Sequence, residues 1–140
     1  MNHYRFEDLK TGQTEQFVVT VDQKMQELFC QLTRDTNPLH TDEAYAVSRG
    51  FEGRVIYGML TASFLSALAG VFVPGAYGIL HSVEVKFVKP VYAGDVLKVT
   101  GTVTELNETV RLAVIKVEIT NQKGEKVLRG KLKAGVLNEK

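Results

Sequence analysis

The sequence predicts an α+β fold in which a five-stranded antiparallel sheet wraps round a central hydrophobic helix, with a short helical overhang before that helix. Two observations lead to this prediction. No Asp, Glu, Lys or Arg occurs between Val55 and Val83. After Pro74 the apolar period changes from 3.6 residues to 2 and stays there. A helix without charges must be buried, and apolar faces of strands are its natural cover.

The first strand and the first helix precede the uncharged segment. The stretch Thr14–Val21 is rich in Val, Thr and Phe, which is typical of a strand. Thr20 and Gln23 then stand at capping-box spacing. Apolar residues follow at helical intervals, which predicts an amphipathic helix to about Thr33. These residues are Met25, Leu28, Phe29 and Leu32.

The segment between this helix and the central one is expected to bend sharply. Helix cannot continue through Asn37-Pro38, because a residue before proline is pushed toward extended geometry. Thr41 or Asp42 can cap a second small helix, which runs through Ser48 and stops at Gly50.

The central helix is predicted to begin at about Gly58. The residues from Met59 to Val73 are apolar nearly all round, and Pro74-Gly75 close the segment. This leaves fewer residues than the roughly 20 that a bilayer requires. We therefore expect a helix buried on all sides in a protein core, and no membrane span.

Four further strands are expected after the helix. Val83, Val85 and Phe87 alternate with polar residues, which gives the first of them. The others are expected at 95–106, 110–120 and 126–136, with turns at 106–108 and 121–124. One strand carries a continuous apolar row that would face the helix: Ala113, Ile115, Val117 and Ile119.

Composition narrows the classes of function. A chain of 140 residues with 44% hydrophobic residues predicts a single domain spanning 1–140. Its formal net charge of +1 argues against nucleic acid or an acidic membrane as a partner. One cysteine, Cys30, and three histidines provide neither a disulfide nor a zinc set, so no metal is expected. The charged N-terminus does not read as a signal peptide, which favours the cytoplasm.

Asp35 and His40 are the candidate catalytic pair. They lie five residues apart around the Asn37-Pro38 bend, so their side chains can converge on one water. A carboxylate and an imidazole in that arrangement suit general acid-base catalysis. The spacing alone leaves open a turn-capping aspartate beside a surface histidine. A metal held by Asp35, His40 and Asp42 is disfavoured, because no second histidine is near.

The residues themselves resemble a known family. Asp35-Thr36-Asn37-Pro38-Leu39-His40, with Gly58-Met59 opening the apolar helix, resembles the signature of the MaoC-like (R)-specific enoyl-CoA hydratases. Phe6–Leu9 and Pro90–Asp95 support the likeness, which covers most of the chain. The fold of that family is the hot dog, a long helix wrapped by an antiparallel sheet. The resemblance implies reversible hydration of trans-2-enoyl-CoA to (3R)-3-hydroxyacyl-CoA without a cofactor.

The resemblance also implies a role for each site residue. Asp35 would orient and deprotonate a water, and His40 would hold the same water and deliver a proton to the α-carbon. Asn37 would fix the loop, and the backbone N–H of Gly58 would bind the thioester oxygen. Ser66 would hydrogen-bond the catalytic carboxylate. A helix N-terminus suits the enolate charge on independent physical grounds.

Two residues depart from the family pattern. Arg34 stands where a small residue, usually glycine, precedes the catalytic aspartate. Tyr57 stands directly before Gly58, where a histidine or small residue is frequent. Either residue could narrow the acyl pocket, and Arg34 could instead place a cation near the thioester or a phosphate.

Two other functions remain as alternatives. A hot-dog thioesterase would hydrolyse the same thioesters, but such enzymes commonly carry an acidic residue on the central helix, which this helix lacks from Gly58 to Val73. A non-catalytic acyl-CoA binding module would need the pocket but not the Asp35–His40 pair. In each case the partner is an acyl-CoA thioester, or the same acyl group on acyl carrier protein. We also expect a homodimer or a larger homo-oligomer of dimers, because one helix leaves the sheet edge and pocket mouth uncovered.

Overall fold

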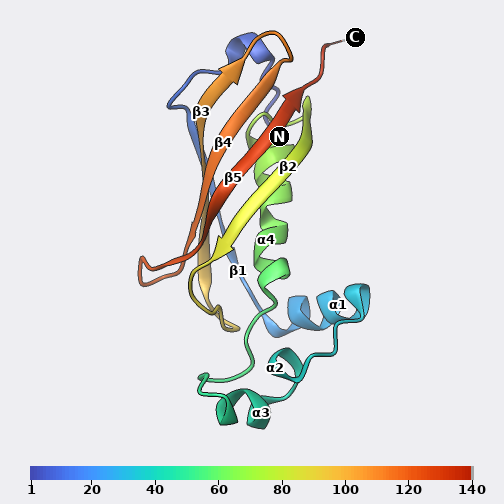
Figure 1. The fold of residues 1–140 in the computed structure, drawn as a ribbon, viewed down its shortest axis with the longest axis vertical. Helices are drawn as coiled ribbons and strands as arrows, with labels where there is room; N and C mark the ends of the chain where they lie inside the picture. Colours follow the sequence, from blue (N-terminus) through green and yellow to red (C-terminus); the bar gives the residue numbers. More distant parts are fainter. Residues whose placement is uncertain (140) are drawn as a thin grey trace.

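The computed structural model, which describes residues 1–139, contains one five-stranded antiparallel sheet curved round a helix (Figure 1). The strand order is β1-β3-β4-β5-β2, and every neighbouring pair is antiparallel. The strands are β1 Thr14–Thr20, β2 Gly78–Phe87, β3 Val96–Asn107, β4 Leu112–Thr120 and β5 Lys126–Val136. The predicted fold class is confirmed.

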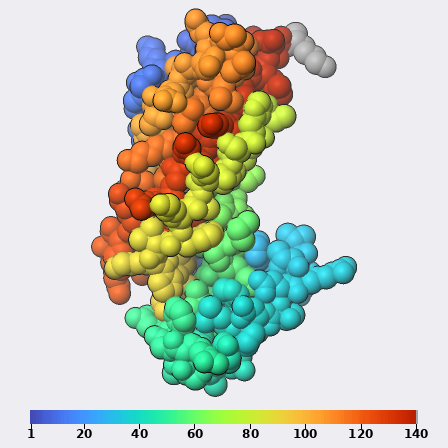
Figure 2. Space-filling model, in the orientation of Figure 1, coloured from blue at the N-terminus to red at the C-terminus, as the bar shows by residue number. Residues whose placement is uncertain are grey.

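The helices divide between the sheet and one end of the molecule. They are η1 Phe6–Asp8, α1 Gln23–Thr33, α2 Pro38–Thr41, α3 Glu43–Ser48, α4 Gly58–Ala67 and η2 Leu68–Phe72, whose wider π turns continue α4. Figure 1 shows α4 lying against the sheet, and Figure 2 shows α1, α2 and α3 gathered as a separate lobe at the end where α4 begins. These three helices form the overhang that the sequence predicts.

Burial of alternate strand residues holds the sheet to the helix. The predicted apolar row of β4 is fully buried, as are residues of β3 and β5 that face the same side. Leu65 and Leu68 reach this face from α4 and η2, and each buried leucine contributes about 1.5–3 kcal/mol. Gly101 of β3 allows the close approach, because a Cβ there would lie 2.9 Å from Leu68 Cδ2.

Burial of α4 is incomplete in the protomer, which corrects the expectation of a helix covered on all sides. Met59, Ser63, Ser66 and Gly70 are exposed, and Met59 keeps 64% of its surface accessible. Their spacing places them along one side of the helix. The sheet covers the opposite side, so α4 is buried on one side only although it carries no charge.

The buried face of α1 also differs from the expected one. Leu28 and Leu32 are 55% and 80% exposed, whereas Gln26 is only 3% exposed. Met25, Phe29 and Cys30 pack against the core on the same side as Gln26. The helical period was therefore read correctly, but the helix is rotated so that a polar residue faces inward.

The turn between β3 and β4 is displaced from its predicted place. β3 continues through Asn107, and the chain turns at residues 108–111. Arg111 adopts a left-handed φ of 50° at the end of this turn. The Asn121–Gly124 turn lies where the sequence predicts it, with Gly124 at a φ of 74°.

Two non-glycine residues among residues 1–139 are left-handed: the φ of 62° belongs to Arg34, at the end of α1, and the φ of 50° belongs to Arg111. A left-handed residue that carries a side chain is uncommon and marks a place where the chain must turn sharply. At Arg111 that place is the β3–β4 turn.

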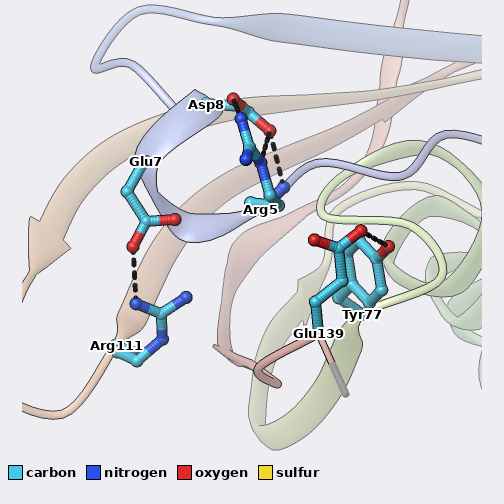
Figure 3. A network of polar contacts seen from close by, with 6 residues as sticks. All are labelled: Arg5, Glu7, Asp8, Tyr77, Arg111 and Glu139. Atoms are coloured by element: carbon cyan, nitrogen blue, oxygen red, sulfur yellow. Dashed lines mark hydrogen bonds and ion pairs between the residues drawn. The ribbon is translucent and has the colours of Figure 1, made fainter.

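Polar contacts hold the N-terminal and C-terminal segments to neighbouring parts of the fold, at the end of the sheet far from α1–α3 (Figures 1 and 3). Arg5 pairs with Asp8 at 3.0 Å, and Arg111 donates to Glu7 at 2.7 Å. Tyr77 donates its hydroxyl to Glu139 at 2.8 Å. These contacts are distant from the candidate catalytic pair, so we assign them to the fold. Within residues 1–139, no helix has the length and apolar character needed to cross a membrane.

Candidate active site

The Asn37-Pro38 bend starts a helix, which corrects the expectation that both catalytic candidates project from an open loop. Asn37 caps α2 by accepting the Leu39 N–H on its side-chain oxygen at 2.9 Å. Pro38 occupies the first turn, where its missing N–H costs nothing. His40 is consequently held on α2 while Asp35 remains in the segment before it.

The Asp35 side chain is anchored by one of its two oxygens. Its Oδ1 accepts the Asn37 N–H at 3.0 Å, an arrangement typical of an aspartate that caps a turn. Asp35 is exposed in the protomer. No hydrogen bond to Oδ2 is found within residues 1–139, so this oxygen is available to a water or substrate. The turn-capping and catalytic interpretations of Asp35 are therefore compatible.

One ring nitrogen of His40 is fixed by the backbone. Nδ1 lies 2.7 Å from the Val55 carbonyl oxygen. Because a carbonyl can only accept, Nδ1 must carry the hydrogen in this contact. The lone pair of neutral His40 is then on Nε2, which is the nitrogen left to exchange a proton.

Tyr57 connects the two candidates. Its hydroxyl donates to the main-chain oxygen of Asp35, and its ring lies 4.1 Å from the His40 ring, centroid to centroid. The ring also packs at 5.1 Å against Phe29. Tyr57 is 2% exposed, and burial raises the pKa of its hydroxyl, which therefore stays a donor at neutral pH. Tyr57, which departs from the family pattern, therefore holds the main chain of Asp35 and the ring of His40 in place.

Gln26 holds the same segments together from α1. Its Nε2 donates to the carbonyl oxygens of Val55 at 2.9 Å and His40 at 3.3 Å, and its Oε1 accepts the Tyr57 N–H at 3.2 Å. All three partners are backbone groups that the sheet and helices leave unpaired. A buried amide with every bond made is rigid.

Arg34 and Cys30 shape the entry to Asp35. Arg34 ends α1 in the left-handed conformation, φ 62°, and its N–H donates to the Cys30 carbonyl. Glycine adopts this conformation at least cost. Cys30 is half-buried, and its Sγ lies 3.3 Å from the Asp35 carbonyl oxygen. Arg34, which departs from the family pattern, therefore occupies the left-handed position where the backbone turns from α1 toward Asp35.

The start of α4 faces the pair across a cavity of about 430 Å³. Asp35, His40, Tyr57, Gly58 and Phe87 line it. The N–H groups of Gly58 and Met59 have no acceptor within the described chain. They begin a helix, whose first turn carries a partial positive charge. The arrangement can therefore place a water between Asp35 and His40 and stabilise negative charge opposite them.

Ser66 is not part of this cavity. It lies eight residues beyond Gly58, about 12 Å along the helix, and it is exposed. It makes no hydrogen bond to Asp35 within the described protomer, so the contact implied by the resemblance is not formed in a single copy. Among residues 1–139, no cluster of three His, Cys, Asp or Glu side chains is suited to hold a metal ion.

Sequence reasoning missed Gln26 and Phe87. A glutamine inside an amphipathic helix normally faces solvent, so its burial had no local signal. Phe87 was assigned to a strand, which is correct, but not to the site; it ends β2, is 52% exposed and lies over Gly58. The one available signal was that residues 55–57 precede a helix outside any strand, so their backbone N–H and C=O groups need hydrogen-bond partners from elsewhere, which Gln26 provides.

Fold and site together define a hot-dog protein in which Asp35 and His40 share a cavity with the N-terminus of the central helix. Residues 7–127 match the family model of the MaoC like domain. The chain belongs to the MaoC-like family. The predicted family is confirmed.

Relatives within the family are named hydratases. An (R)-specific enoyl-CoA hydratase from Rhodospirillum rubrum is 42% identical over 104 residues, which cover 74% of this chain and 72% of the relative. An R-hydratase structure from Pseudomonas aeruginosa has a TM-score of 0.91 at 28% identity, covering 98% of this chain and 88% of that one. The (R)-hydratase from A. caviae has a TM-score of 0.89 at 31% identity, covering 93% and 98%. The enzyme class predicted from the sequence is the class of these relatives.

Proposed function

We propose that this chain catalyses the reversible hydration of trans-2-enoyl-CoA to (3R)-3-hydroxyacyl-CoA. The observation that carries the proposal is that Asp35, His40 and Gly58 line one cavity. The names of the family relatives support it. The chemistry needs a base, an acid and a site for a developing oxyanion, and these three residues supply one each.

In the hydration direction, Asp35 and His40 hold the water above the β-carbon. The water oxygen bonds to the β-carbon, and Asp35 Oδ2 takes one of its protons. Electrons of the C=C bond move toward the thioester carbonyl, whose oxygen gains negative charge. Protonated His40 then delivers the proton on Nε2 to the α-carbon, while Val55 keeps Nδ1 in place. A proton passes from Asp35 back to His40 through solvent before the next turnover.

Gly58 supports the developing charge through its backbone. The free N–H groups at the start of α4 point toward the cavity end of the helix, where an enolate oxygen is stabilised by hydrogen bonds and the helix dipole. Such donors are each worth roughly 10²–10³ in turnover in well-studied sites. No metal or organic cofactor enters these steps.

The direct test is hydration of crotonyl-CoA by the purified chain. We expect loss of enoyl absorbance, and formation of 3-hydroxybutyryl-CoA that only an (R)-specific dehydrogenase oxidises. Formation of the (S) product would contradict the stereochemical proposal. Release of free CoA thiol instead of hydration would favour the thioesterase alternative, and binding without turnover would favour the acyl-CoA binding module.

Gly58→Ala tests the close contact at the start of α4. A Cβ at this position would lie 3.1 Å from the Phe87 ring, which would have to move into the cavity. We expect kcat/KM for crotonyl-CoA to fall about tenfold or more, since small displacements of reacting groups cost up to about 10²-fold. Activity of Gly58→Ala equal to that of the unmodified chain would remove the steric argument.

We propose a homodimer as the assembly that completes the protein. β2 is an edge strand with exposed Val83 and Phe87, and the exposed side of α4 includes Met59. An open apolar edge of this kind favours pairing with a second copy. We expect light scattering to give a mass of about twice 15.6 kDa, or a multiple of that dimer. A monodisperse 15.6 kDa species would contradict the assembly. The cytoplasm stays the predicted compartment, and the same enoyl group carried on acyl carrier protein stays the second predicted substrate.

A further inference from the structure

A second cavity, of about 270 Å³, adjoins the catalytic one. His40, Gly58 and Phe87 line both cavities, so the two spaces lie side by side at the start of α4. The walls of the second are mainly apolar and include Val55, Ile56, Val91 and Val127. Lys89 also lines it, and the side chain of Lys89 is 51% exposed, so this cavity opens to solvent there.

Thr61 places one unpaired polar atom in this apolar wall. The residue is 2% exposed and lines the second cavity, and its Oγ1 has no hydrogen-bond partner within residues 1–139. An unpaired buried hydroxyl costs about 1–3 kcal/mol. A ligand group that hydrogen-bonds to this hydroxyl would remove that cost.

The order in which the substrate's atoms are connected decides which part of it enters which cavity. This step rests on the proposed function. With the thioester oxygen at Gly58, the α- and β-carbons must lie on the side of Asp35, which lines only the first cavity. The sulfur is attached to the opposite side of the carbonyl carbon. The thiol arm therefore leaves toward the second cavity.

We propose that the second cavity binds the cysteamine end of the thiol arm, with Thr61 Oγ1 hydrogen-bonded to its first amide. Residues three apart on a helix lie about 5–6 Å from each other, which is the separation of Thr61 from Gly58. The amide nitrogen follows the sulfur by three bonds, so it can lie near Thr61 when the thioester oxygen is at Gly58. A volume of about 270 Å³ holds about nine groups the size of a water molecule, enough for the sulfur, two methylenes and the amide.

Two small thioesters separate this proposal from a role in acyl-chain binding. The crotonyl thioester of N-acetylcysteamine carries the amide, and S-propyl crotonothioate lacks it. We expect Thr61→Val to lower kcat/KM about five- to tenfold for the first and to leave the second unchanged, as one neutral hydrogen bond is lost. Thr61→Ser keeps the hydroxyl and should retain activity on both. An equal loss on both thioesters, or a loss that grows with acyl length, would overturn the proposal.

Two further measurements separate folding and turnover from binding. Thr61→Val removes no internal hydrogen bond, so its unfolding midpoint should equal or exceed that of the unmodified chain. Calorimetric titration with CoA itself needs no turnover, and we expect Thr61→Val to weaken its binding by the same five- to tenfold. Weaker CoA binding in a chain that hydrates no enoyl thioester would uphold the thiol-arm site and reject the proposed function. Unchanged CoA binding would reject the thiol-arm site.

Discussion

Asp35→Asn and His40→Ala should each lower kcat for crotonyl-CoA by about 10²- to 10⁴-fold, the usual contribution of a general acid or base. The Asn side chain can still accept the Asn37 N–H, so the turn that Asp35 Oδ1 holds is kept. What is lost is the oxygen that takes a proton from water. His40→Ala removes Nε2 and also the Nδ1 contact with the Val55 carbonyl, which keeps its hydrogen bond from Gln26. Initial rates across enoyl-CoA concentrations, with circular dichroism of each variant, measure the loss.

Asp42→Asn is the matched control for these variants. Asp42 caps α3 by accepting the Tyr45 N–H on its side chain at 3.0 Å, and asparagine caps a helix equally well. This variant removes a nearby negative charge without touching the cavity that Asp35 and His40 line. We expect its kcat to be unchanged. Hydration that survives in both Asp35→Asn and His40→Ala would refute the catalytic assignment.

The sheet could be predicted from sequence because its signal is local. In β3 and β4 every second residue is buried along most of the strand, and one buried face fixes which residues point inward. The inward row of β4 lies on the buried face. The side of α4 that stays uncovered could not be predicted in the same way. Its residues are uncharged on every side, so nothing in the pattern distinguishes the face against the sheet from the face that carries Met59.

The candidate pair could be predicted from the motif, whereas the residues that hold the pair in place could not. Asp35 and His40 are close in sequence and share one bend, so their approach is a local property. Tyr57 and Gln26 reach the pair from residues 22 and 14 positions away in the chain, through contacts with Asp35 and His40. Such contacts depend on how α1 packs on the segment before α4. The periodicity of α1 predicted a helix but not its rotation.

Gln26→Met should destabilise the chain by about 2–4 kcal/mol and lower kcat as well. Methionine fills a similar volume but leaves the Tyr57 N–H and the His40 carbonyl buried without a partner, and each such group costs about 1–3 kcal/mol. This is a large share of the stability of a typical domain, about 5–15 kcal/mol. Urea unfolding followed by circular dichroism measures the first effect, and saturating crotonyl-CoA measures the second.

Gln31→Met is the control on the same helix, because Gln31 is exposed and its change should leave stability within about 0.5 kcal/mol. The expected fall in kcat separates positioning from mere stability. If Gln26 only held the fold, the folded fraction of Gln26→Met would turn over at the normal rate once saturated. Because Gln26 bonds the main chain of His40 and of Tyr57, which packs on the His40 ring, its loss should move the imidazole within the folded protein. A normal kcat in that variant, with stability reduced, would show that His40 is positioned by Val55 and α2 alone.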